Sequence, residues 1–162
     1  MQKIVPFLWF DDNAEEAVNY YVSVFSGSPS DKKNSKILET SRYDEASAKA
    51  SGRTKGSVMV MSFELDGKEF NALNGGPIFK FTEAVSFVVR CENQEEIDYF
   101  WEKLSAVPEA EQCGWLKDKF GLSWQIIPKN LGEFLNNSQT SDALMKMKKI
   151  DINELKNAGN KQ

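Results

Sequence analysis

Few side chains in this chain can do chemistry, and one type is missing. The 162 residues include two cysteines and no histidine. A serine or cysteine nucleophile is normally activated by an imidazole, and many zinc and iron sites use imidazole ligands. The sequence therefore excludes Ser-His-Asp triads, Cys-His dyads and His-ligated metal centres.

The two cysteines, Cys91 and Cys113, lack CxxC spacing and are too few for a disulfide framework. Cys113 lies two residues before Trp115 with no base at a recognisable spacing, so a packed thiol is favoured over a nucleophile. Cys91 lies just before a predicted helix start. A small side chain that only packs there is favoured over a thiolate stabilised by the helix dipole. We expect free thiols in a reducing compartment.

The charge balance argues against nucleic acid as a partner. There are 20 Lys+Arg and 24 Asp+Glu, for a net charge of −4 and a pI of about 5.0. A protein that grips a phosphate backbone needs the opposite sign. The apolar stretch at residues 4–10 is too short for a signal peptide, and nothing approaches a membrane span. We expect a soluble, cytoplasmic protein with no membrane partner.

The elements that position these side chains follow a repeated pattern. Residues 4–10 and 84–90 are rich in β-branched and aromatic residues, which is typical of strands. Each stretch is followed by an Asn-x-x-Glu helix start, at Asn13 and Asn93. Apolar residues then recur with helical spacing. The repeat predicts two related modules.

Further elements complete an α+β fold. Strands are predicted at residues 37–43, 58–65, 68–73, 111–117 and 122–127. Residues 44–55 are predicted to form an exposed connection, and residues 140–158 a single helix. The predicted order is a βαβββ module, then a βαββ module, then a helix.

Several segments carry a family resemblance. Residues 113–128 read Cys-Gly-Trp-Leu-Lys-Asp-Lys-Phe-Gly-Leu-Ser-Trp-Gln-Ile-Ile-Pro, residues 70–77 read Phe-Asn-Ala-Leu-Asn-Gly-Gly-Pro, and residues 6–17 contain Pro-Phe-Leu-Trp-Phe and Asn-Ala-Glu-Glu-Ala. With these motifs the chain resembles, over residues 4–155, the PhnB-like group, also called the 3-demethylubiquinone-9 3-methyltransferase-like domain. That group belongs to the vicinal oxygen chelate superfamily, with glyoxalases, bleomycin-resistance proteins and extradiol dioxygenases.

The resemblance implies a glyoxalase-like fold of paired βαβββ modules whose curved sheets form a cleft, usually in a homodimer. We expect one domain over residues 1–162, with modules at 1–77 and 78–130 and a C-terminal helical segment at 131–162. Gly75-Gly76-Pro77 contains the only double glycine of the sequence and lies between two predicted strands, where it could form a tight turn or a cofactor loop. A tight turn is the favoured interpretation.

Metal-using members of the superfamily hold a divalent cation with four inward side chains, commonly His, Gln and Glu. The resemblance places these positions at Val5 or Phe7, Ala84 or Ser86, Asn71 or Asn74, and Gln125. Neutral amides bring no charge to offset the hydration that a cation loses. We therefore expect neither a catalytic metal nor another cofactor.

The amides suit the binding of a small molecule instead, because Asn and Gln offer both a donor and an acceptor. Gln125 alternates with Trp124 and Ile126, so a helix packed on the tryptophan leaves the glutamine facing the cleft. Trp9 and Trp115 can line the cleft or pack in the core. The predicted ligand-binding residues are Phe7, Trp9, Asn71, Asn74, Ser86, Cys113, Trp115 and Gln125.

The sequence therefore predicts a small-molecule-binding protein of the PhnB-like group, with an aromatic or amphipathic ligand and a second copy of the chain as partners. The alternative is an enzyme of the same superfamily, either a metal-assisted lyase or isomerase or a methyltransferase-like protein. Methyl transfer of the nucleotide-fold type needs glycine in a strand-to-helix turn, and both such turns lack it. A third possibility is a structural dimer with a filled cleft.

Overall fold

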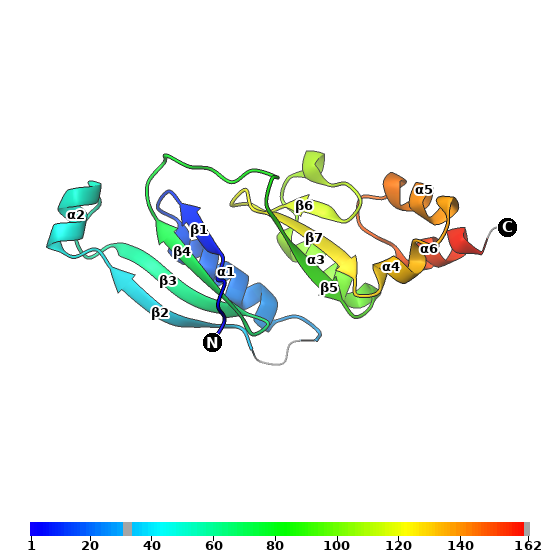
Figure 1. Cartoon of the computed structure of the whole chain (residues 1–162), viewed down its shortest axis with the longest axis horizontal. Helices are drawn as coiled ribbons and strands as arrows, with labels where there is room; N and C mark the ends of the chain where they lie inside the picture. The colour runs from blue at the N-terminus through cyan, green and yellow to red at the C-terminus, as the bar shows by residue number, and fades with distance from the viewer. Residues whose placement is uncertain (31–33, 161–162) are drawn as a thin grey trace. The chain divides into compact units, whose positions relative to one another are not determined.

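The computed structural model describes residues 1–30 and 34–160, so residues 161 and 162 of the predicted C-terminal segment lie outside it. The chain forms two compact units, Met1–Lys80 and Phe81–Gln162 (Figure 1). Each unit contains a small sheet with a helix packed against it, which confirms the predicted α+β fold. In the described part of the chain, every helix is too short or too polar to cross a membrane.

The first unit is built around a four-stranded sheet of described residues. Its elements are β1 (Phe7–Phe10), α1 (Ala14–Ser26), β2 (Lys36–Arg42), α2 (Glu45–Ser51), β3 (Val58–Leu65) and β4 (Lys68–Asn74). The strand order is β1-β4-β3-β2, with β1 parallel to β4 and the other neighbours antiparallel. The helix α1 packs mainly on β3, where Val18, Tyr21 and Phe63 are fully buried.

The start of α1 differs from the prediction. Asn13 precedes the helix, but its side chain makes no capping hydrogen bond. Instead the backbone N–H of Ala14 donates to Oδ1 of Asn74, at 2.8 Å, from the end of β4. The cap is therefore supplied by a residue distant in sequence, and it ties the helix to the sheet.

The predicted exposed connection at residues 44–55 contains the short helix α2. Asp44 caps it by accepting from the backbone N–H of Ser47 at 2.7 Å, while the Ser47 hydroxyl accepts from the Asp44 N–H at 3.0 Å. Gly52 ends the helix with a left-handed φ of 72°. The reciprocal cap and the buried Ala48 outweigh the polar composition that predicted a loop.

The second unit is built around a three-stranded sheet of described residues in the order β5-β7-β6. Its elements are β5 (Ser86–Cys91), α3 (Gln94–Leu104), the short helix η1 (Pro108–Ala110), β6 (Trp115–Lys117), β7 (Ser123–Pro128), α4 (Leu131–Phe134), α5 (Ser138–Lys146) and α6 (Ile152–Gly159). Asn93 caps α3 as predicted, because its Oδ1 accepts from the Glu96 N–H at 3.0 Å.

The single helix predicted over residues 140–158 is wrong, because the chain breaks between α5 and α6. The carbonyl groups of Met147 and Lys148 accept from the N–H groups of Cys113 and Gly114, at 2.9 and 2.8 Å. This pairing is incompatible with a continuous helix and brings Ile150 into a buried cluster with Met147. A new helix then starts behind Asp151, whose side chain accepts from the N–H of Glu154.

Asp118 holds the turn between β6 and β7. Its side chain is almost fully buried, and Oδ1 accepts from the N–H groups of Phe120 and Leu122 at 2.8 and 3.0 Å. Oδ2 accepts from the indole Nε1 of Trp124 at 2.8 Å. Gly121 has a φ of +88°, which other residues adopt only with strain. The Asp-x-x-Gly-x-x-Trp motif is therefore a turn that anchors the buried tryptophan.

We predict that Asp118→Ala lowers the free energy of unfolding by about 3 kcal/mol or more, because two buried donors and one partly buried donor lose their acceptor. Urea unfolding followed by circular dichroism measures the change. Asp142→Ala, at an exposed position of α5, is the matched control and is expected to change little. Equal unfolding midpoints for the two variants would contradict this role of Asp118.

Candidate functional site

In the first unit, Phe7 and Trp9 of β1 lie on the sheet face opposite α1, together with Asn71 of β4. The parallel register places Phe7 beside Asn71. The alternating residues Leu8 and Phe10 point to the helix-covered side and are only 6% and 3% exposed, whereas Phe7 is 56% exposed. This face, which we call the open face of the first unit, therefore combines aromatic rings with one amide.

Asn71 presents its amide in a fixed direction. The hydroxyl of Ser62, on β3, donates to Oδ1 of Asn71 at 2.6 Å. No acceptor among residues 1–30 and 34–160 takes a hydrogen bond from Nδ2 of Asn71. The amide can therefore act as a donor toward a molecule on this face.

Trp9 packs against the glycine segment that follows β4. Its indole Nε1 donates to the carbonyl oxygen of Gly76 at 2.9 Å, and the ring of Phe79 meets it edge-on at 4.9 Å. A Cβ atom on Gly75 would lie 2.2 Å from the indole, so only glycine fits there. The N–H groups of Gly75 and Gly76 donate to the carbonyl oxygens of Phe10 and Asp11, at 2.9 and 3.0 Å, and the turn itself falls on residues 77 and 78, so the glycines form a segment beside the end of β1 that leaves room for an aromatic ring.

Asn74 is used by the fold. It is 6% exposed, and besides capping α1 it donates from Nδ2 to the carbonyl oxygen of Val58 at 3.2 Å. Its backbone carbonyl accepts from the hydroxyl of Tyr43 at 2.6 Å. Both polar ends of the side chain are therefore engaged inside the first unit, and Asn74 is left out of the ligand-binding set proposed below.

In the second unit, Ser86, Trp115 and Gln125 share the sheet face opposite α3. Antiparallel register places Trp115 beside Gln125, and the parallel β5 brings Ser86 within reach. Nε2 of Gln125 donates to the Ser86 hydroxyl at 3.0 Å. Trp124 and Ile126 point the other way and are almost fully buried. We call this the open face of the second unit.

Cys113 lies apart from this group, next to the break between α5 and α6. Its backbone has a positive φ of 52°, and its N–H bonds to Met147. Its sulfur lies 3.7 Å from the sulfur of Met145 and 3.3 Å from Nε2 of Gln112. In this position the residue joins the sheet to the C-terminal segment.

Two polar atoms that sequence reasoning missed are buried without a hydrogen-bond partner in the described part of the chain. They are Nε of Arg53, after α2, and the hydroxyl of Ser123, on β7 beside Gln125. Neither residue lies in a sequence pattern that indicates a catalytic or ligand-binding role. Composition alone carries no signal that a loop arginine is buried.

The residues present do not fit a divalent cation. Asn71, Ser86 and Gln125 offer neutral oxygens, and Phe7 offers none. Oδ1 of Asn71 already accepts from Ser62. In the described residues, no group of three or more Cys, Asp or Glu side chains gathers where a metal ion would be held. Without an anionic or imidazole ligand, the lost hydration of the ion is not offset.

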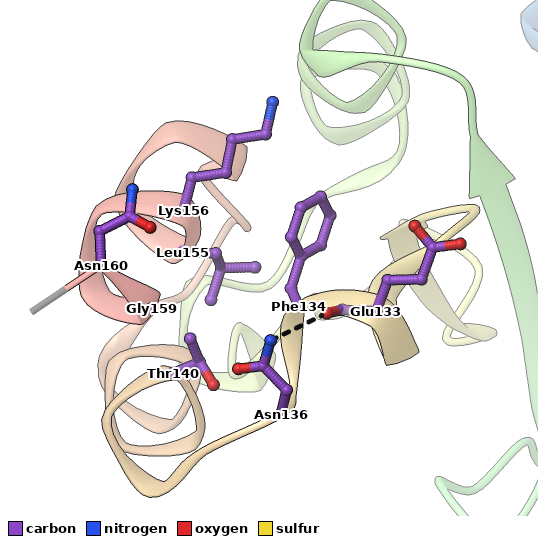
Figure 2. A pocket seen from close by; sticks show the side chains of 8 residues that line it. All are labelled: Glu133, Phe134, Asn136, Thr140, Leu155, Lys156, Gly159 and Asn160. Atoms are coloured by element: carbon purple, nitrogen blue, oxygen red, sulfur yellow. Dashed lines mark hydrogen bonds between the residues drawn. The ribbon is translucent and has the colours of Figure 1, made fainter. Parts of the chain in front are cut away.

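A cavity of about 240 Å³ lies among the C-terminal helices (Figure 2). Phe134 and Leu155 form its apolar side, while Glu133 and Lys156 extend away from its centre. The amide of Asn136 bonds to the carbonyl of Glu133 at 3.5 Å. None of the predicted ligand-binding residues lines this cavity.

Comparison with known proteins gives a family match. The sequence profile described as 3-demethylubiquinone-9 3-methyltransferase matches residues 2–127. The solved structure of the PhnB protein from Bacillus cereus is 37% identical, covers 78% of this chain and 99% of its own, and has a TM-score of 0.60. Protein PA1353 from Pseudomonas aeruginosa shares the fold at 15% identity, with 79% and 98% coverage and a TM-score of 0.55. The comparison with curated proteins finds no match.

The two thiols differ in their surroundings. Cys91 is fully buried, and burial raises the pKa of its thiol far above the usual range, with the nearby carboxylate of Glu96 adding to the effect. A raised pKa keeps the thiol protonated through neutral and mildly alkaline pH. Cys113 is partly exposed. Because the thiolate is the reactive form, the two residues should react at very different rates.

We predict that iodoacetamide at about pH 8 labels Cys113 and spares Cys91 in the folded protein. Intact-mass spectrometry should show one added group per chain, and peptide mapping should place it on Cys113. Labelling in concentrated urea is the control, and there both thiols should react. Equal labelling of Cys91 in folded and unfolded protein would contradict the prediction.

Proposed function

Because the chain belongs to the 3-demethylubiquinone-9 3-methyltransferase family, which includes PhnB proteins, we propose that it binds a small aromatic or amphipathic molecule on the open faces of its sheets, without a catalytic metal. The observation that carries the proposal is the Gln125–Ser86 hydrogen bond beside Trp115. It holds an amide and a hydroxyl next to an aromatic ring.

The hydrogen bond decides which polar atoms remain for a ligand. Gln125 donates one N–H to the Ser86 hydroxyl, so its Oε1 remains available as an acceptor. The Ser86 hydroxyl accepts this bond and can still donate its own hydrogen. One acceptor and one donor side by side match a neutral group such as an amide or a hydroxyl. The Trp115 ring supplies a surface for stacking.

The helix starts also support binding over nucleotide-dependent methyl transfer. Methyl transfer of the nucleotide-fold type needs a glycine-rich strand-to-helix turn that lets the cofactor approach the backbone. Residues 11–13 and 92–93 contain no glycine. Asn74 caps the start of α1 and Asn93 caps the start of α3. Both strand-to-helix turns therefore lack glycine, and a side chain of the same unit caps each helix start.

We predict that benzamide, a neutral aromatic amide, quenches or shifts tryptophan fluorescence and that Gln125→Leu weakens its binding about tenfold, through loss of one oriented amide. Folding should stay intact, because Gln125 is only partly buried. The same substitution at the exposed Gln139 of α5 is the matched control. Equal affinities for wild type and Gln125→Leu, or severe unfolding of that variant, would contradict the proposal.

The second proposed partner is another copy of the chain. Large apolar side chains other than the proposed ligand-binding residues are exposed in both units, including Leu38 at 44%, Ile78 at 73% and Val85 at 63%. Burying such surface stabilises association. Native mass spectrometry of freshly purified protein should give a dimer of 18.3 kDa chains. A monomer would contradict this partner, and a stoichiometric metal ion would contradict the metal-free binding site.

A further inference from the structure

Arg53 is held in place by the loop that follows α2. Gly52 turns the chain in the left-handed region, and Gly56 then donates its N–H to the carbonyl of Tyr43 at 2.8 Å. The Tyr43 hydroxyl in turn bonds to the backbone of Asn74, at the end of β4. The loop is thereby tied to the end of β4, and Arg53 is brought beside the glycine segment that follows this strand.

The guanidinium of Arg53 lies against Gly76. Its Nη1 is 3.7 Å from the position that a Cβ atom on Gly76 would take. Its Nε is buried and bonds to no acceptor within residues 1–30 and 34–160. The side chain as a whole is 22% exposed. A positive group is therefore largely withdrawn from water on one side and still reachable on the other.

The charge of Arg53 is weakly compensated. The ion pair given by the structure joins Nη1 to Oδ1 of Asp11 at 4.0 Å, the outer limit for such a pair, and the Asp11 side chain is 55% exposed. A bidentate carboxylate would approach to about 2.8 Å. A partly buried guanidinium with so distant a partner is a favourable place for an oxyanion.

An aromatic surface adjoins the charge. Gly76, which lies near the guanidinium, accepts the hydrogen bond from the Trp9 indole, and Phe79 packs edge-on against that indole while 60% exposed. We propose that Arg53, Trp9 and Phe79 form a site in the first unit for a small aromatic carboxylate. The proposal rests on the proposed function for the aromatic part of the ligand and goes beyond it in assigning the charge.

In this site the carboxylate bonds to the Nη groups of Arg53 in place of Asp11, and the ring lies against Phe79. The test compares benzoate with benzamide, which has the same shape and no charge, by ligand-observed NMR titration of the full chain carrying Gln125→Leu, in which the benzamide site of the second unit is weakened. This protein should bind benzoate about tenfold more tightly at low salt, and added salt should reduce the difference.

Substitutions identify the group responsible. Arg53→Gln should abolish the preference for benzoate, and Arg53→Lys should keep part of it, because an ammonium is charged but lacks the planar fork. Asp11→Asn should strengthen benzoate binding by removing the competing carboxylate. Lys49→Gln, on the exposed part of α2, removes one positive charge elsewhere and should leave both affinities unchanged. Circular dichroism checks that each variant is folded.

The outcomes separate this inference from the proposed function. Equal binding of benzoate and benzamide by the Gln125→Leu protein, or unchanged benzoate binding by folded Arg53→Gln, overturns the carboxylate site. A second outcome is that Gln125→Leu binds benzamide as tightly as wild type while the preference for benzoate still depends on Arg53. This outcome overturns the proposed function at the second unit and leaves the carboxylate site standing.

Discussion

The hydrogen bonds that converge on Asp118 determine the chemistry of the second unit, because they decide which residues of β7 face outward. With the Trp124 indole bound to Oδ2 on the helix-covered side, alternation along the strand puts Gln125 on the open face. A register slip of one residue would bury the amide and expose the indole. The contact between Gln125 and Ser86 therefore depends on the carboxylate of Asp118, which is not among the proposed ligand-binding residues.

The first unit reaches a similar result through its backbone. The segment after β4 leaves room for the Trp9 ring because Gly75 has no side chain. The Gly76 carbonyl oxygen accepts from the indole and orients it. Tyr43 and Asn74 bind the neighbouring loop and α1 to the end of the same strand. One strand end thus positions the helix start, an aromatic ring and the loop that carries Arg53.

The sequence predicted the features that depend on near neighbours. The boundaries of β3, the cap at Asn93 and the outward direction of Gln125 follow from alternation and from residues three positions apart. The cap of α1 was missed because its acceptor, Asn74, is 60 residues away. The break after α5 was missed because helical spacing cannot show that the Met147 carbonyl bonds to Cys113. Contacts between distant segments override local pattern in both cases.

The same limit applies to the site, since residues adjacent in one motif perform different tasks. Gln125 faces the open side, whereas Asp118 and Cys113 hold the turn and the C-terminal segment. The two proposed sites also differ in the groups that they offer to a charged ligand. Next to the free Oε1 of Gln125 a carboxylate would meet another acceptor, while beside Arg53 it would meet donors. Under the two proposals, the second unit therefore takes neutral groups and the first takes anions.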